Sequence, residues 1–249
     1  FYDAVSDKIL KPTSILDGGK NDKTPGYLGS YEVALLLNNE LRGIKLDGLL
    51  SNVSIVVINV YDGLGTNDKT YARALAYAEK SGANLVINGA TLYDTLNNEK
   101  AYKSCEQVKL LKNKEVAVID SPYSSIIKNS FSLSDCEGTT PIGYIKNNFT
   151  VENKLPGRNF KLVMFGEDVI SLTTDGDALP FLYSSSPQWS TILGGAVVAK
   201  IFSNSSLSTA EIVKKMLSTH TLQLNDSEYR LINYNTFFEN ELLSTTKTN

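Results

Sequence analysis

The feature that most constrains the fold is a regular alternation of short apolar runs with amphipathic segments. Runs at 53–60, 85–88 and 115–119 are rich in β-branched residues, which is typical of parallel strands covered on both faces. Helix-forming segments at 69–80 and 100–111 separate these runs. Parallel strands need crossover connections, and the crossovers are right-handed. This order therefore predicts an α/β fold with three αβα layers and a mostly parallel central sheet.

The remaining elements are expected around this frame. The pattern predicts a short strand at 14–16, a helix at 29–42, an irregular stretch at 122–160, a strand at 160–164 and two helices at 187–202 and 207–217. No repeat or linker interrupts the sequence. We therefore expect one domain, 1–249, with an irregular N-terminal segment at 1–27 and a C-terminal extension at 221–249.

The composition excludes some function classes. Lys and Arg number 24 against 27 Asp and Glu, and a net charge of −3 offers nucleic acid no basic surface. The longest apolar run, 192–199, is too short to insert across a membrane. His220 is the single histidine, so a mechanism that needs two imidazoles is excluded.

Other motifs carry less information. Cys105 and Cys136 suit either one disulfide or two separate buried thiols, and they form no zinc site. Acidic turns at 62–65 and 175–177 lack the spacing of a calcium loop, so we expect no cofactor. Asn-x-Ser/Thr sequons occur at four positions, but a sequence rich in these residues contains some by chance. The sequons are Asn52, Asn148, Asn204 and Asn225.

Four passages, in this order, resemble the subtilisin-like serine proteases (subtilases). They are the strand at 84–88 after an Ala-rich helix, the stretch 165–171, the serine-led apolar helix 184–199 and the amphipathic helix 207–217. The resemblance covers about residues 25–220 and implies a subtilisin-like fold. It also implies export, to a secreted or periplasmic location.

The resemblance assigns roles to particular residues. It places Ser186 at the nucleophile position, Leu28 at the catalytic His and Asp17 at the acid, only 11 residues earlier. Asp120 begins the stretch where the family has an oxyanion-site Asn. Substrate-binding positions fall on Asn88, Gly89 and Ala90.

A serine hydroxyl needs a neighbouring base to accept its proton, and an aliphatic Leu28 cannot do so. The interpretation we favour is a pseudoprotease that binds a peptide or protein partner without cutting it. One alternative is an active peptidase that resembles the sedolisins, with Glu32 as base and Asp120 in the oxyanion site. Another is a purely structural or interaction subunit that pairs with its partner by strand addition.

Overall fold

The structure is a computed structural model. The residues that it describes are 9–14, 36, 39–41, 44–46, 49–50, 53–60, 67–89, 102–122, 132–152, 160–172, 181–218, 222–223 and 229–239.

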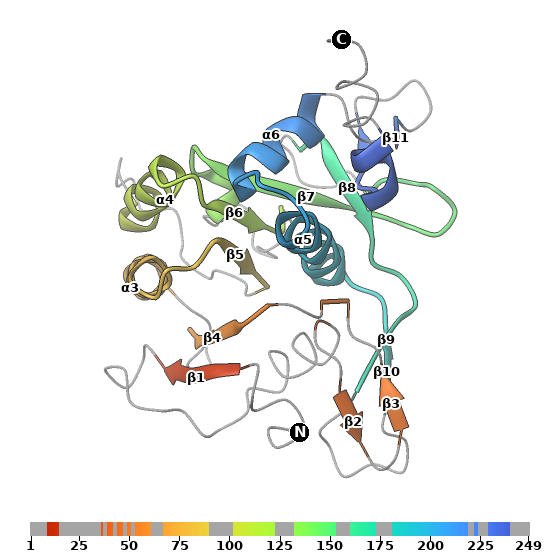
Figure 1. Cartoon of the computed structure of the whole chain (residues 1–249), viewed down its shortest axis with the longest axis horizontal. Helices are drawn as coiled ribbons and strands as arrows, with labels where there is room; N and C mark the ends of the chain where they lie inside the picture. The colour runs from red at the N-terminus through yellow and green to blue at the C-terminus, as the bar shows by residue number, and fades with distance from the viewer. Residues whose placement is uncertain are drawn as a thin grey trace.

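The centre of the fold is a six-stranded sheet with the order β11-β12-β8-β7-β6-β5 (Figure 1). Neighbouring strands from β5 to β12 run parallel, and β11 pairs antiparallel with β12. The strand bounds are β5 Leu85–Asn88, β6 Ala117–Asp120, β7 Thr139–Ile145, β8 Leu162–Phe165, β11 Leu222–Gln223 and β12 Arg230–Leu231.

Helices cover both faces of this sheet, and the alternation of side chains along β6 shows how. Val118 packs into a cluster with α3 and α4, whereas Ala117 and Ile119 pack into a cluster with α5 and α6. The predicted three-layer α/β class with a mostly parallel sheet is therefore confirmed. The helix bounds are α3 Asp68–Lys80, α4 Lys103–Asn113, α5 Pro187–Ser203 and α6 Thr209–Ser218.

Helix α5 lies directly on the sheet because two glycines let it approach. A Cβ on Gly194 would stand 2.5 Å from the Cδ1 of Ile142 in β7, and one on Gly195 would stand 2.5 Å from the Cδ1 of Ile87 in β5. Ile192 and Ala196 on the same helix are buried. The predicted central, apolar character of this helix is confirmed.

Two expectations near the N-terminus are corrected. Within the predicted helix 29–42, Leu36 is helical, but Asn39–Leu41 is a strand, β2, paired antiparallel with β3, Ile44–Leu46; residues 29–35, 37–38 and 42 lie outside the described residues. Pairing with Ile44 places Leu41 in a strand, although its spacing from Leu36 and Leu37 is helical. Of the strand expected at 14–16, only Ser14 is described, as the last residue of β1, Ile9–Ser14, which pairs parallel with β4, Ile55–Asn59; residues 15–16 lie outside the described residues.

The irregular stretch expected at 122–160 is also corrected, because it contains the 3₁₀ turn η1, Leu133–Asp135, and the inner strand β7. Pro141 and Gly143 lie inside β7 and obscure its pattern, since both residue types are uncommon in inner strands. Strands β9, Val169–Leu172, and β10, Phe181–Ser184, form a separate antiparallel pair that the sequence pattern missed.

The described part of the segment 221–249 completes the core. β12 pairs with β8, and a short helix follows at 234–239. Phe237 in that helix has no exposed surface. No helix in the described ranges is both long enough and apolar enough to cross a bilayer.

Asp68 joins the first turns of α3 and α4. Its carboxylate accepts the backbone N–H of Lys103 at 2.9 Å and of Ser104 at 3.0 Å, together with the Ser104 hydroxyl. The N-cap residue of α4, Tyr102, makes no side-chain capping bond. Asp68, which lies in α3, therefore accepts hydrogen bonds from the first backbone N–H groups of α4.

Asp68→Ala is expected to lower the free energy of unfolding by about 1–2 kcal/mol, because the start of α4 loses its cap. Urea unfolding followed by circular dichroism measures the change. The neighbouring exposed residue supplies a matched control, Lys69→Ala, which should stay within about 0.5 kcal/mol of the wild type. Equal losses in the two variants would contradict the capping role.

Candidate functional site

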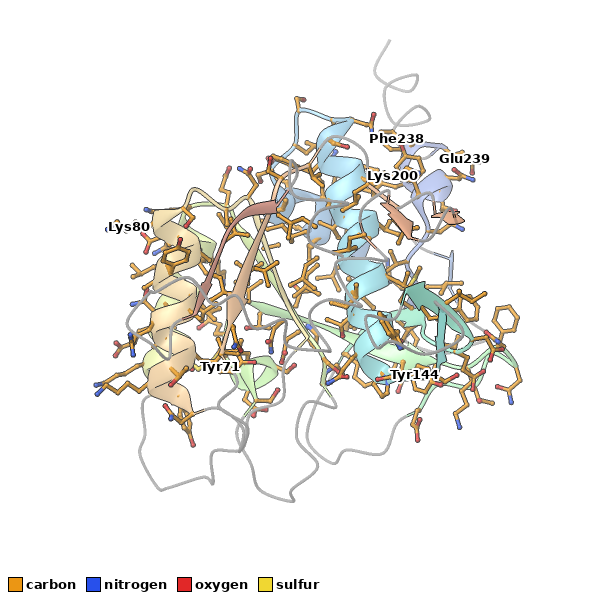
Figure 2. The ribbon with its side chains drawn as sticks, turned by 90° about the horizontal axis from the view of Figure 1, so that it is seen from below. Tyr71, Lys80, Tyr144, Lys200, Phe238 and Glu239 are labelled. Carbon is orange, nitrogen blue, oxygen red and sulfur yellow. A yellow bond between two sulfur atoms is a disulfide. The ribbon has the colours of Figure 1, made fainter. Side chains whose placement is uncertain are left out.

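The candidate site lies at the edge of the sheet where the parallel strands end. Asn88 is the last residue of β5 and Asp120 the last of β6, and Gly166 follows β8. Parallel strands present their carboxyl ends at one edge, where α/β folds place their binding crevices. In Figure 2, Tyr71 and Tyr144 lie toward one end of the molecule and Lys80 and Lys200 toward the other.

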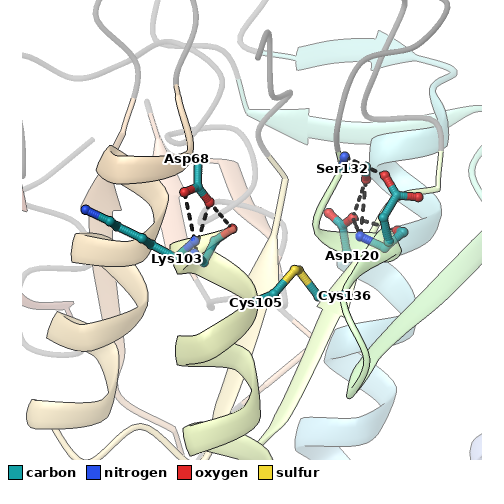
Figure 3. The surroundings of a disulfide bond; sticks show 9 residues. Asp68, Lys103, Cys105, Asp120, Ser132 and Cys136 are labelled. Carbon is teal, nitrogen blue, oxygen red and sulfur yellow. Dashed lines mark hydrogen bonds between the residues drawn. A yellow bond between two sulfur atoms is a disulfide. The ribbon is translucent and has the colours of Figure 1, made fainter. Parts of the chain in front are cut away.

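A chain of hydrogen bonds runs across this edge. The Tyr71 hydroxyl of α3 donates to Asn88 Oδ1 at 2.6 Å, and Asn88 Nδ2 donates to Asp120 Oδ1 at 2.6 Å. The other carboxylate oxygen, Asp120 Oδ2, accepts the Ser132 hydroxyl at 2.9 Å and both the amide and the hydroxyl of Ser134, at 2.8 and 2.6 Å (Figure 3). Both carboxylate oxygens are therefore engaged.

Burial dominates the electrostatics of Asp120. The residue has no exposed surface, and removal of its carboxylate from water raises its pKa above 3.8. Hydrogen bonds from Ser134, Asn88 and Ser132 favour the anion and oppose this rise. The carboxyl group therefore holds Ser132 and Ser134 in place, although its own removal from water costs free energy.

A disulfide holds the segment that supplies these donors. Cys105 in the first turn of α4 is bonded to Cys136, directly after η1, and the two are 31 residues apart (Figure 3). Of the two arrangements open to the cysteines, the structure contains the disulfide. Closing a loop of this length stabilises the folded chain by about 3–4 kcal/mol. The bond also keeps Ser132 and Ser134 close to Asp120.

Ser186 is the N-cap of α5, and its polar groups serve the start of that helix. Its hydroxyl oxygen accepts the N–H of Gln188 at 3.1 Å. Its own N–H donates to the carbonyl of Gly166 at 2.9 Å, and its carbonyl accepts the N–H of Trp189 at 3.1 Å. Pro187, at the first helical position, has no N–H to satisfy.

Gly166 allows this close approach of β8 and α5. A Cβ at this position would stand 2.6 Å from the carbonyl oxygen of Ser186 and 2.5 Å from the hydroxyl oxygen of Ser190. The Ser190 side chain has no exposed surface, and its hydroxyl has no hydrogen-bond partner among the described residues. The contact therefore leaves one buried polar group unsatisfied.

Acidic side chains lie beside the same end of α5. The pKa of Tyr144 is raised to about 12 by burial first, and then by the charge and hydrogen bond of Glu167. Glu167 also accepts the N–H of Asn147 at 2.6 Å, and Asp168 accepts the side-chain amide of Asn147 at 2.8 Å. The Asp168 N–H donates to the Ser185 hydroxyl at 3.1 Å, next to Ser186. These contacts tie the end of β7 to the start of α5.

The structure places some of the residues expected to form the site. Asn88 and Asp120 are brought together by a direct hydrogen bond, half-buried Gly89 follows Asn88, and Ser186 begins α5. The other candidates lie outside the described residues; they are Asp17, Leu28, Glu32, Ala90 and His220. No described cluster of three or more His, Cys, Asp or Glu side chains fits a metal ion.

Sequence reasoning missed three members of the hydrogen-bond network. The pattern of α3 indicates only an amphipathic helix. It does not reveal that the hydroxyl of Tyr71 reaches Asn88 at the end of β5. Ser132 and Ser134 carry a recognisable signal, because Ser132 and Asp135 form a capping box. That motif marks the turn η1, although it does not reveal the partner Asp120.

Solved structures share this fold. The prenylagaramide maturation protease PagA superimposes with a TM-score of 0.69 at 12% identity, over 92% of this chain and 86% of that one. The epidermin leader peptide processing serine protease EpiP from Staphylococcus aureus gives 0.74 at 10% identity, over 96% and 72%. An S41 psychrophilic protease gives 0.68 at 14% identity, over 88% and 78%. No family model and no curated protein matches the sequence.

These findings correct the family expected from the sequence. The neighbours are described as maturation, leader-peptide-processing and S41 proteases, and identities of 10–14% show the fold alone. The assignment to the subtilisin-like serine proteases therefore does not stand. What remains is a serine-protease-like α/β fold, and the candidate residues rest on their own geometry.

Asp120→Asn should change how stability depends on pH. With a raised pKa in the folded state, the stabilising contribution of Asp120 is full below pH 3.8 and is lost as the pH rises through the folded-state value. The difference in unfolding free energy, wild type minus variant, should therefore fall as the pH rises. Urea unfolding from about pH 3 to about pH 7 measures it.

Glu137→Gln is the matched control for this experiment. The pKa of exposed Glu137 is lowered, because Lys112 donates to its carboxylate and attracts its charge. The contribution of Glu137 is therefore present at neutral pH and lost in acid. The difference in unfolding free energy, wild type minus variant, should fall with rising pH for Asp120→Asn and rise for Glu137→Gln. Slopes of the same sign would contradict the raised pKa assigned to Asp120.

Ser190→Ala is expected to raise the unfolding free energy by up to about 1 kcal/mol, because it removes a buried hydroxyl without a partner. Thr209→Val provides the contrast. The Thr209 hydroxyl accepts the N–H of Ala117 at 2.9 Å and donates to the carbonyl of Asn84, so its loss should cost about 1–3 kcal/mol. Thermal unfolding of both variants tests the pair, and a destabilised Ser190→Ala would show that Ser190 has a partner.

Proposed function

We propose that this protein binds peptides along the edge strand β5, beside the carboxyl ends of its parallel strands, through a serine-protease-like fold, and does not hydrolyse them at Ser186. The observation that carries the proposal is the hydrogen bonding of Ser186. Its hydroxyl oxygen and its N–H are both engaged in starting α5, by Gln188 and Gly166.

Acyl transfer by a serine needs two things that these contacts do not provide. The hydroxyl must donate its proton to a base, and N–H groups must stabilise the negative oxygen of the intermediate. Bonded to Gly166, the N–H of Ser186 is not directed at a substrate oxygen. Loss of a base and of an oxyanion donor reduces turnover by roughly 10²–10⁶-fold.

Asp120 is poorly suited to act as the base that accepts the serine proton. Its two carboxylate oxygens already accept from Asn88, Ser132 and Ser134, and proton transfer from a substrate or nucleophile would require these bonds to break. A positioning role for the loop that follows β6 fits this arrangement better.

Peptide binding is supported by the fold and by its neighbours. EpiP is described as a protease that processes a leader peptide. In this protein β5 is an edge of the six-stranded sheet within the described residues, and Gly89 follows it. An extended peptide can pair with such an edge through its backbone.

We also propose an extracytoplasmic location. The Cys105–Cys136 disulfide supports this, because disulfides persist mainly in oxidising compartments.

The absence of catalysis is tested with fluorogenic peptides and a fluorophosphonate probe. We expect no turnover and no adduct at Ser186, with wild type and Ser186→Ala indistinguishable. An adduct together with turnover lost in Ser186→Ala would establish an active serine peptidase. Turnover that appears only in acid and is abolished by Glu32→Gln would establish a carboxylate base instead.

Peptide binding is tested by selection from a phage-displayed peptide library, followed by fluorescence anisotropy with the selected peptide. Gly89→Trp should weaken binding at least about tenfold, because an indole at the end of β5 obstructs the edge. Lys80→Trp, at the far end of α3, is the control and should bind like the wild type. Failure to enrich any peptide, or equal binding by both variants, would contradict the proposal.

A further inference from the structure

The turn that follows β7 contains one of the four sequons, Asn148-Phe149-Thr150. The turn is ordered by its own backbone, since the N–H of Lys146 donates to the carbonyl of Thr150 at 3.0 Å and that of Phe149 to the carbonyl of Lys146 at 2.9 Å. The Phe149 ring packs edge-on against Phe165 with centroids 5.5 Å apart. Residues 147–150 are all exposed. Asn148 is therefore held at the surface in a defined conformation.

The side chains of this sequon are arranged for a reaction at the amide nitrogen. Asn148 Oδ1 accepts the Thr150 hydroxyl at 2.6 Å and the Thr150 N–H at 3.1 Å. Donors at this oxygen stabilise the negative charge that develops on it as Nδ2 loses a proton. No hydrogen bond of Asn148 Nδ2 occurs in the described part of the chain, so the nitrogen is presented to solvent.

Asn204 supplies an internal comparison. It is also exposed and begins the sequon Asn204-Ser205-Ser206, but it is the C-cap of α5. Its Nδ2 donates to the carbonyl of Lys200 at 2.8 Å and to the Ser203 hydroxyl at 3.1 Å. Modification would replace one of the two hydrogens on Nδ2 and so break one of these two bonds at the end of the helix. Asn52 and Asn225 lie outside the described residues.

We propose that Asn148 is an N-glycosylation site and that Asn204 is not. In the reaction, Nδ2 of Asn148 forms a bond to C1 of an oligosaccharide carried on a lipid pyrophosphate. The C1–oxygen bond to the pyrophosphate breaks, and the proton from Nδ2 leaves with the released lipid pyrophosphate. The Cys105–Cys136 disulfide supports passage through an oxidising compartment, where such donors act.

A glycan at this position has a physical consequence for the surface. Phe149 is 54% exposed, although it is a large apolar side chain. A hydrophilic chain on the preceding residue would cover it and reduce association through that ring. The inference depends on export and not on peptide binding, so the two proposals can fail separately.

The test uses the protein secreted from its natural source. Peptide-N-glycosidase converts a glycosylated Asn to Asp, and mass spectrometry of the resulting peptides should find Asp at position 148 and unchanged Asn at position 204. Asn148→Gln and Thr150→Ala should each remove the glycan, whereas Thr150→Ser and Asn204→Gln should retain it. Circular dichroism confirms that each variant is folded.

Two results would overturn the inference. One is an unmodified Asn148 in the secreted, disulfide-bonded wild type, which needs no variant to fold. The other is a glycan at Asn204, since this would show that engagement of the amide nitrogen in a helix cap does not prevent the reaction.

Discussion

The organisation of the candidate site depends on one buried carboxylate. Asp120 is the last residue of β6 and has no exposed surface. Its carboxylate oxygens accept hydrogen bonds from Asn88 at the end of β5 and from Ser132, the N-cap of η1. A buried anion costs free energy unless it is hydrogen-bonded. The position of the loop after β6 is therefore coupled to the position of Asn88. The disulfide strengthens this coupling, because it fixes Cys136 to α4 independently of the charge.

A second constraint acts on the other side of the same edge, where β8 meets α5. Gly166 lies so close to the start of the helix that no side chain fits there. Ser186 completes the contact with its N–H and caps the helix with its hydroxyl. The same polar groups that a catalytic serine would offer to a substrate here stabilise the fold. The polar groups of Ser186 therefore have a structural role at the start of α5.

Sequence reasoning succeeded where periodicity and burial agree. The strands β5, β6 and β8 and the four long helices follow from apolar runs and amphipathic spacing. It failed where a long-range contact decides the local structure. Strand β7 contains Pro141 and Gly143, yet it is inner because β6 and β8 flank it. Segment Asn39–Leu41 has leucines at helical spacing near it and still pairs as a strand.

The late position of β12 in the sequence has a consequence for synthesis. Arg230 and Leu231 pair with Leu162 and Val163, so among the described strands β8 lacks its outer neighbour until the ribosome has added residues 230 and 231. An open edge with apolar residues invites pairing with other nascent chains. A truncation before residue 230 would remove β12 and leave β8 without this neighbour among the described strands, and the exposed edge would promote aggregation during expression.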